Sequence, residues 1–285
     1  MNRIHIGISK SLELPQSGFL LIDDEVRDIP RARVFDPTIH SFNPLKDLDY
    51  RRACDFLDTL DALFSRGDST LTKDTGLDYI GDALDRNPRS LVELIPEPDG
   101  KSSPGHVWAH GKIKRLLRSP VLRRMLTKPA NFSFNPRSTI IARVNRAEFG
   151  EFDSLAIGLI LMSYYKGQLC VPDFGFYARE YHCSVLREQR LIASVNFLAE
   201  LPPKLQRMCL LQKTVPSGAT FEDAKALADA ACLRRGHVEY SDFVTAAMTV
   251  KTVTPLSVPP VAVERTRLYA AQEAERKAKQ KRRGW

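Results

Sequence analysis

The densest α/β pattern in the chain runs from Ser138 to Phe197 and reads STIIARVNRAEFGEFDSLAIGLILMSYYKGQLCVPDFGFYAREYHCSVLREQRLIASVNF. Short apolar runs between turn residues predict strands, and the longer stretches that separate them predict helices. The strands are expected at 138–144, 168–172 and 191–197, and the helices at 152–165 and 181–190. Such alternation across short loops is typical of a parallel sheet with helices on both faces. We therefore predict an α/β fold in which these three strands are neighbours.

The rest of the chain adds strands before this stretch and helices on either side of it. Further strands are predicted at 3–9, 18–22, 33–36 and 208–212. A helical insertion at about 49–130 contains predicted helices at 49–64, 69–85 and 107–126, and closing helices follow at 222–233 and 240–248. The predicted organisation is an α/β domain at 1–251, a Pro-containing linker at 252–263 and a basic arm at 264–285. The domain has a mostly parallel sheet with flanking helices.

The C-terminal arm holds most of the positive charge. The net charge is +8, and residues 264–285 contain eight Lys or Arg against three Glu, so the preceding residues are nearly neutral. This distribution favours contact with a polyanion, DNA ahead of RNA, without sequence preference. The residues expected to bind nucleic acid are Arg276, Lys277, Lys279, Lys281, Arg282 and Arg283. The alternative is a solvated tail that only aids solubility.

The cysteines and the apolar stretches indicate the compartment. The five cysteines lie far apart and form no C-x-x-C pair, which disfavours a disulfide framework and a structural metal. Buried thiols in a reducing, cytoplasmic environment are expected, and His182 is interpreted as a surface histidine beside a buried Cys183. The start of the chain lacks the long apolar segment of a signal peptide. The most apolar stretch, 155–162, is too short to span a bilayer of about 30 Å.

Asp173 follows the predicted strand 168–172. Ligands of open parallel sheets bind at the carboxyl ends of the strands, and an NTPase needs a carboxylate there to hold Mg²⁺. Asp173 is therefore the candidate catalytic and metal-binding residue, with a simple strand-ending role as the alternative. The triplet Asp173-Phe174-Gly175 also occurs in protein kinases, but no H-R-D motif precedes it here.

A second set of candidates lies around the strand 191–197. Asn196 stands near the end of this strand, where an amide would sense a γ-phosphate. Arg187 and Arg190 precede the strand and would reach the nucleotide of a neighbouring subunit. In the alternative interpretation both arginines are solvated and Asn196 caps the following turn.

A partial phosphate-loop pattern follows the first predicted strand. The residues Gly7-Ile8-Ser9-Lys10-Ser11 place Lys10 and Ser11 where G-x-x-x-x-G-K-[ST] would bind phosphate. Only one glycine is present, however, and the chain returns to strand at Gly18 after Pro15. That leaves no room for the helix whose N-terminus would bind the phosphate.

The order of these elements resembles the core of the FtsK/HerA superfamily, which includes the type IV secretion coupling proteins. The corresponding pieces are Thr139–Arg143, Phe152–Tyr165, Gln168–Asp173, Arg187–Arg190 and Leu191–Pro202, with Val34–Asp36 and Ser41–Leu45 upstream. The resemblance implies a P-loop ATPase core with ATP and Mg²⁺. It also implies Asp173 as the metal carboxylate, Asn196 as the sensor, and Arg187 or Arg190 as a finger acting in trans. The chain departs from the family in lacking the Walker A glycines and in having Phe174 where a water-activating Glu is usual.

The resemblance leads to a specific expectation of function. We expect an ATPase-like subunit of a DNA-translocation or DNA-packaging system of a mobile element or phage. Its hydrolysis is expected to be weak or absent, and it is expected to work as an oligomer or with partner subunits. The alternative is a non-enzymatic nucleic-acid-binding or virion-associated protein on an ATPase-derived scaffold.

Overall fold

The computed structural model describes residues 3–7, 12, 14–24, 29–44, 50–64, 70–86, 91–188, 190–211, 214–231 and 238–249. All of them belong to one compact unit, Met1–Val250. The predicted linker and basic arm lie outside the described residues, as do Lys10 and Ser11. The roles assigned to these segments therefore stay predictions.

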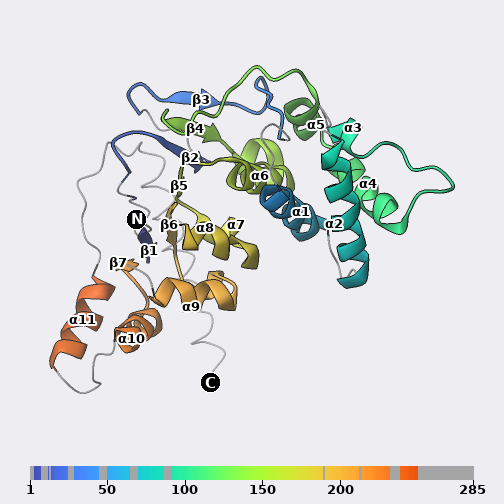
Figure 1. Ribbon diagram of the computed structural model, residues 1–285. Coiled ribbons are helices and arrows are strands. Elements are labelled where there is room, and N and C mark those ends of the chain that lie inside the picture. The colour runs from blue at the N-terminus through green and yellow to red at the C-terminus, as the bar shows by residue number, and fades with distance from the viewer. Residues whose placement is uncertain are drawn as a thin grey trace, which may run out of the picture. The chain divides into compact units, whose positions relative to one another are not determined.

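The described residues form one sheet of seven strands (Figure 1). The strands are β1 Arg3–Ile6, β2 Phe19–Asp23, β3 Arg33–Phe35, β4 Ile140–Arg143, β5 Gln168–Val171, β6 Leu191–Val195 and β7 Thr214–Pro216. Their order across the sheet is β3-β4-β2-β5-β6-β1-β7, and every neighbouring pair is parallel. The predicted α/β fold with a mostly parallel sheet is confirmed.

The three strands of the 138–197 stretch are not all neighbours, so that prediction was wrong in part. β5 and β6 do pair, with Cys170 opposite Ile192. β2 lies between β4 and β5, and its Leu21 stands opposite both Ile141 and Cys170. All five residues of β2 are buried, which suits a central position in the sheet. The order of elements in the chain does not reveal that β2 lies between β4 and β5, because β2 precedes β4 by more than a hundred residues.

The described helices that connect strands cover one face of the sheet, whereas helices were predicted on both faces. The main core cluster joins buried residues of the helices to strand residues such as Leu20, Ile140 and Val171. A second cluster contains strand residues of the opposite face and no described helix residue. Its members are Leu12, Phe19, Leu21, Ile141, Cys170 and Ile192, with Leu14, Ile29 and Ala32 packed against them.

The direction of the connections explains this one-sided arrangement. The connections from β3 to β4, β4 to β5, β5 to β6 and β6 to β7 all run toward the β7 edge and contain helices. Because such crossovers are right-handed, they lie on the same face. The connections from β1 to β2 and from β2 to β3 run the other way. The described residues of these two connections, 7, 12, 14–18, 24 and 29–32, contain no helix.

The helical insertion lies between β3 and β4. It comprises α1 Tyr50–Phe64, α2 Thr70–Asp85, α3 Leu91–Leu94, α4 Pro104–Leu116 and α5 Pro120–Thr127. The single helix predicted at 107–126 is thus two helices. The break occurs because Ser119 caps α5, accepting a hydrogen bond from the Leu122 N–H at 3.2 Å, and Pro120 occupies its first turn.

The connection from β4 to β5 contains α6, Arg146–Tyr164, which begins earlier than the predicted 152–165 helix. Gly150 interrupts it with φ 79° and ψ 166°, a conformation that glycine adopts without a steric penalty. The segment 146–149 is therefore a separate turn in front of the long buried helix. α7 Phe174–Tyr177 and α8 Cys183–Arg187 follow β5, so the helix predicted at 181–190 is shorter than expected.

The strand predicted at 208–212 was wrong, because these residues belong mostly to α9, Pro203–Leu211. Pro203 begins the helix, and Leu205 and Cys209 are buried four residues apart, which is a helical spacing. The closing helices are α10 Phe221–Ala230 and α11 Val238–Met248, which pack on each other. None of the described helices is long and apolar enough to cross a membrane.

His182 is buried, with 1% of its surface exposed, which corrects its interpretation as a surface residue. Its Nδ1 accepts a hydrogen bond from the Arg179 N–H at 3.1 Å. Burial, aided by the nearby Arg179 charge, lowers the pKa of His182 to about 3. The imidazole is therefore neutral at physiological pH. Cys170 is a buried free thiol, and burial raises its pKa to about 12.

Candidate functional site

Polar residues gather at the carboxyl edge of the sheet. Asp23 ends β2, Arg143 ends β4, Asp173 follows β5 by two residues, and Asn196 directly follows β6. Because all the described strands are parallel, these ends lie at one edge. The structure thus brings Asp173 and Asn196 to the same edge, at the ends of adjacent strands.

Asp173 is paired with an arginine that the sequence had not indicated. The Arg146 guanidinium lies 2.7 Å from an Asp173 carboxylate oxygen and 3.1 Å from one of Asp24. These three residues line a small pocket together with Ile22, Asp23 and Tyr177. Asp24 comes from the end of β2 and Asp173 from the end of β5, so the guanidinium joins two neighbouring strands.

The Asp173 carboxylate is not used to cap the helix that follows it. Asp173 is the N-cap residue of α7, but its side chain makes no capping hydrogen bond. Strand-ending aspartates often cap the next helix in this way. Asp173 instead forms the ion pair with Arg146.

The surroundings keep Arg146 charged. Burial lowers the pKa of Arg146, but the Asp173 charge and the Asp24 hydrogen bond outweigh that effect and raise it. The guanidinium also lies 4.8 Å from the centre of the Phe176 ring, a cation–π distance. Tyr177 beside it is buried, and burial together with the nearby aspartates raises its pKa, so its hydroxyl stays protonated.

The pocket residues do not fit a magnesium ion in this arrangement. Mg²⁺ prefers carboxylate oxygens in a near-octahedral shell. The Asp24 and Asp173 carboxylates already pair with a permanently charged guanidinium. In the described part of the chain no three His, Cys, Asp or Glu side chains are grouped as metal ligands. The metal role of Asp173 stays a prediction.

Asn196 is held by a carboxylate from the same loop. One oxygen of Glu200 accepts the Asn196 backbone N–H, and the other accepts the side-chain Nδ2, both at 3.0 Å. A Cβ atom added to Gly175 would lie 3.0 Å from the Glu200 Cβ, so Glu200 packs directly against the turn after Asp173. Glu200 therefore links the ends of β5 and β6. The sensor role of Asn196 stays a prediction.

Arg187 and Arg190 lie away from the other candidates. Arg190 directly precedes β6, so it stands at the amino edge of the sheet. Its Nη1 donates to the Tyr165 carbonyl at 2.8 Å, and its Nε pairs with Glu188 at 2.6 Å. Arg187 ends α8 and is exposed. Within one chain neither is brought to Asp173, and the role of either in trans stays a prediction.

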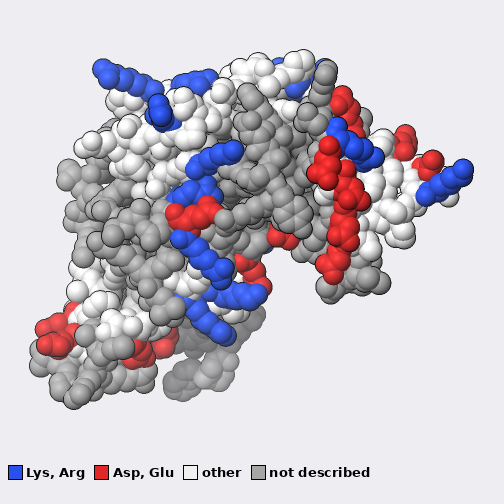
Figure 2. All heavy atoms as spheres, in the orientation of Figure 1, with Lys and Arg blue, Asp and Glu red and all other residues white. Residues whose placement is uncertain are grey.

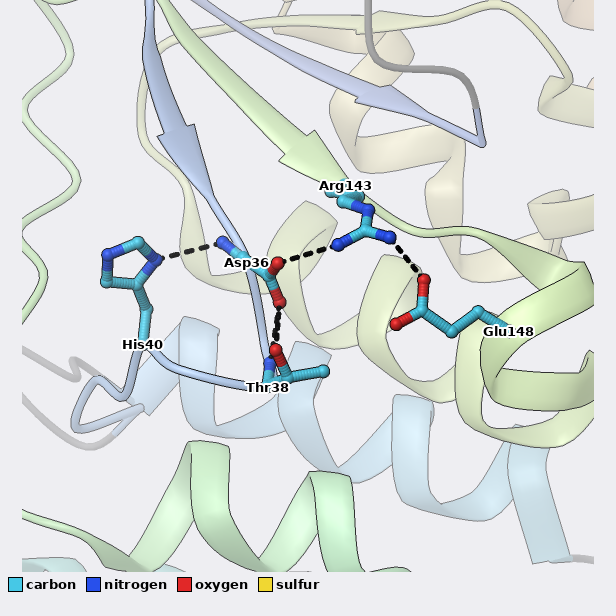
Figure 3. Close-up of polar contacts among 5 residues, drawn as sticks. All are labelled: Asp36, Thr38, His40, Arg143 and Glu148. Carbon is cyan, nitrogen blue, oxygen red and sulfur yellow. Dashed lines mark hydrogen bonds and ion pairs between the residues drawn. The ribbon is translucent and has the colours of Figure 1, made fainter.

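A second polar cluster lies at the ends of β3 and β4 (Figure 3). Arg143 pairs with Asp36 at 2.9 Å and with Glu148. The Asp36 carboxylate also accepts the N–H and hydroxyl of Thr38, at 2.8 and 2.6 Å. Its backbone N–H donates to His40 Nδ1 at 2.9 Å. This network fixes the loop after β3, and Glu148 ties the 146–149 segment to the sheet.

The helical insertion carries charges of both signs. α2 exposes Asp74, Asp78, Asp82 and Asp85 along one face, which forms a column of negative charge in Figure 2. The basic residues of α4 include Lys112, which is buried against Trp108, and Lys114, which pairs with Glu97. The described surface of the insertion therefore has an acidic face on α2 and exposed basic residues on and between α4 and α5, which include Arg115, Arg118, Arg123 and Arg124.

Three residues of this edge, Arg146, Asp24 and Glu200, were not among the candidates predicted from the sequence. The acidic turn at the end of the second predicted strand was the available signal for Asp24. Arg146 and Glu200 had no local signal, because each meets its partner only when strands distant in the chain come together.

No family model and no curated protein sequence matches this chain. Among solved structures, VirB4 of Thermoanaerobacter pseudethanolicus is similar, with a TM-score of 0.52 and 13% sequence identity. The likeness covers 91% of this chain and 90% of that one. At this identity the likeness concerns the fold. The chain therefore shares its α/β fold, with a parallel sheet and flanking helices, with VirB4.

Proposed function

We propose that the protein is an ATPase-like subunit of a DNA-translocation or DNA-packaging system, and that it hydrolyses ATP weakly or not at all by itself. The fold likeness to VirB4 supports the first part, and so does the order of elements that resembles FtsK/HerA ATPases. The candidate residues at the carboxyl edge, Asp173 and Asn196, occupy the position at which open parallel sheets bind ligands.

The ion pair between Arg146 and Asp173 is the main support for weak or absent hydrolysis. Phosphoryl transfer depends on metal ions and positioned charges that stabilise the transition state. A carboxylate that neutralises a guanidinium 2.7 Å away is a poor ligand for Mg²⁺. Phe174 also replaces the carboxylate that would activate water. Both features reduce catalysis more than they reduce nucleotide binding.

The expected partners are a nucleotide, DNA and a neighbouring subunit, each assigned to its own set of residues. Lys10 and Ser11 would contact the phosphates, because β1 ends beside β6 at the same edge as Asn196. The arm residues from Arg276 to Arg283 would bind the DNA backbone. Arg187 or Arg190 would act on a neighbouring subunit, which requires an oligomer or a partner protein.

Nucleotide binding and turnover by the purified full-length chain test this proposal. We expect ATP binding in calorimetry, and a turnover well below about 1 s⁻¹, the lower end for ordinary enzymes. Lys10→Ala should weaken binding because Lys10 would contact the phosphates, whereas Lys166→Ala, at an exposed position, serves as a matched control.

Two outcomes would contradict the proposal. Turnover of about 1 s⁻¹ or faster that disappears in Asp173→Ala would show a working hydrolytic site. A complete lack of ATP and ADP binding would favour the non-enzymatic nucleic-acid-binding protein on the same scaffold.

A further inference from the structure

We infer that Arg146 is a built-in cation that occupies the place of a divalent metal beside Asp173, so that the pocket is closed to metal ions. This inference rests on the proposed function, because only an ATPase-like site gives a reason to expect a metal ion beside Asp173. The new point is that the Arg146 side chain takes the place of that ion.

The Arg146 guanidinium contacts two carboxylates, as a bound divalent cation would. The guanidinium contacts carboxylates from two adjacent strands, Asp173 after β5 and Asp24 after β2, at 2.7 and 3.1 Å. A planar guanidinium with five N–H donors holds two carboxylates at once. A metal ion at this position would have to share oxygen atoms that already accept these hydrogen bonds, or displace the guanidinium.

Neighbouring side chains keep the guanidinium in the pocket. Its side chain is 32% exposed, because the Phe176 ring covers it at 4.8 Å and Tyr177 borders the same pocket. A guanidinium cannot lose its proton to make room for a second cation. Removing it would take a positive charge away from the partly buried Asp24 and Asp173 carboxylates. These carboxylates would then attract a divalent ion more strongly.

The position of Arg146 is set by a short turn that is separate from the long, buried part of α6. Arg146 lies in the 146–149 segment, which Gly150 separates from the packed part of α6. A Cβ atom at Gly150 would meet nothing within 4 Å, so no tight packing fixes this joint. Glu148 of the same segment pairs with Arg143 of β4. Three ion pairs, two from Arg146 and one from Glu148, therefore fasten the segment over the carboxyl edge.

Manganese binding without nucleotide tests the inference. Loss of the Mn²⁺ electron paramagnetic resonance signal during titration measures the affinity of the full-length protein. Wild type should bind Mn²⁺ only weakly, and Asp173→Asn should not change that affinity. Arg146→Met should bind Mn²⁺ at least about tenfold more tightly than wild type, because a repelling charge beside the Asp24 and Asp173 carboxylates is removed. Adding Asp173→Asn to that variant should abolish the gain.

Two matched variants distinguish the effect of the Arg146 charge on Mn²⁺ binding from the effect of a general change in structure. Arg146→Lys keeps the positive charge and should behave like wild type. Arg143→Met removes an arginine that also pairs with two carboxylates at this edge but does not line the pocket, and it should not create Mn²⁺ binding. If Arg146→Met does not fold by circular dichroism, the double variant Arg146→Met/Asp24→Asn removes one carboxylate together with the guanidinium. It should show a smaller gain in Mn²⁺ affinity, because only Asp173 then attracts the ion.

The inference is overturned if wild type binds Mn²⁺ and Asp173→Asn removes that binding, whatever the variants do. It is also overturned if folded Arg146→Met binds Mn²⁺ no better than wild type. The assay contains no nucleotide, so these results leave the ATP-binding test of the proposed function unaffected.

Discussion

Replacing Gly158 by alanine should destabilise the protein, although alanine is the better helix former. Gly158 is a buried residue of α6, and its helix packs there on the Tyr177 ring. A Cβ atom would lie 2.7 Å from Tyr177 Cδ1, 2.9 Å from Cζ and closer still to Cε1. Real Cβ atoms essentially never make contacts this short, so the ring or the helix must move.

The sign of the effect follows from comparing two magnitudes. Alanine in place of glycine stabilises a helix interior by about 1 kcal/mol. Overpacking a well-packed core costs about 1–3 kcal/mol, and the upper part of this range applies because Tyr177 is only 4% exposed and has little room to move. We expect Gly158→Ala to lower the free energy of unfolding by about 1–2 kcal/mol.

Urea unfolding followed by circular dichroism measures this change, and Gly111→Ala is the control. Gly111 lies inside α4, and a Cβ atom there would meet nothing within 4 Å. That variant should gain about 0.5–1 kcal/mol from helix propensity alone. If both variants gain stability equally, the close packing of Tyr177 on Gly158 is refuted.

Three further predictions concern acid stability and the arm. Because burial lowers the pKa of His182 to about 3, the unfolded chain takes up a proton below pH 6.5 that the folded one excludes. Stability should fall from pH 6.5 downward by up to about 1.4 kcal/mol per pH unit, and His182→Gln should remove this part of the slope in urea unfolding. Burial raises the pKa of Asp36, but hydrogen bonds from Thr38 and Arg143 outweigh it and lower the pKa below 3.8. Asp36→Asn should therefore cost about 1–2 kcal/mol near pH 7, and its difference from wild type should shrink in unfolding experiments below pH 3.8. Truncation after Val263 should weaken DNA binding and flatten its salt dependence, whereas equal affinity and slope would exclude the arm as the contact.

The elements that the sequence predicted correctly are those with strong local signals. β2, β4, β5 and β6 are short apolar runs between turn residues, and this pattern holds whatever their neighbours are. Alternation with helices further implied parallel strands, and parallel strands bring their carboxyl ends to one edge. For that reason the common edge of Asp173 and Asn196 could be predicted. Local signals failed at 208–212, where an apolar run matched a strand and a helix equally well.

The partners of the candidate residues depended on contacts between distant parts of the chain. β2 inserts between β4 and β5, and this position puts Asp24 beside Asp173. Arg146 reaches both only because Gly150 turns the 146–149 segment over the edge of the sheet. Side-chain periodicity shows which face of a strand is buried, but it contains no information on which strand lies next to it. The strands and their polar ends could therefore be predicted from local sequence, whereas the pairing of Asp173 with an arginine followed from tertiary packing.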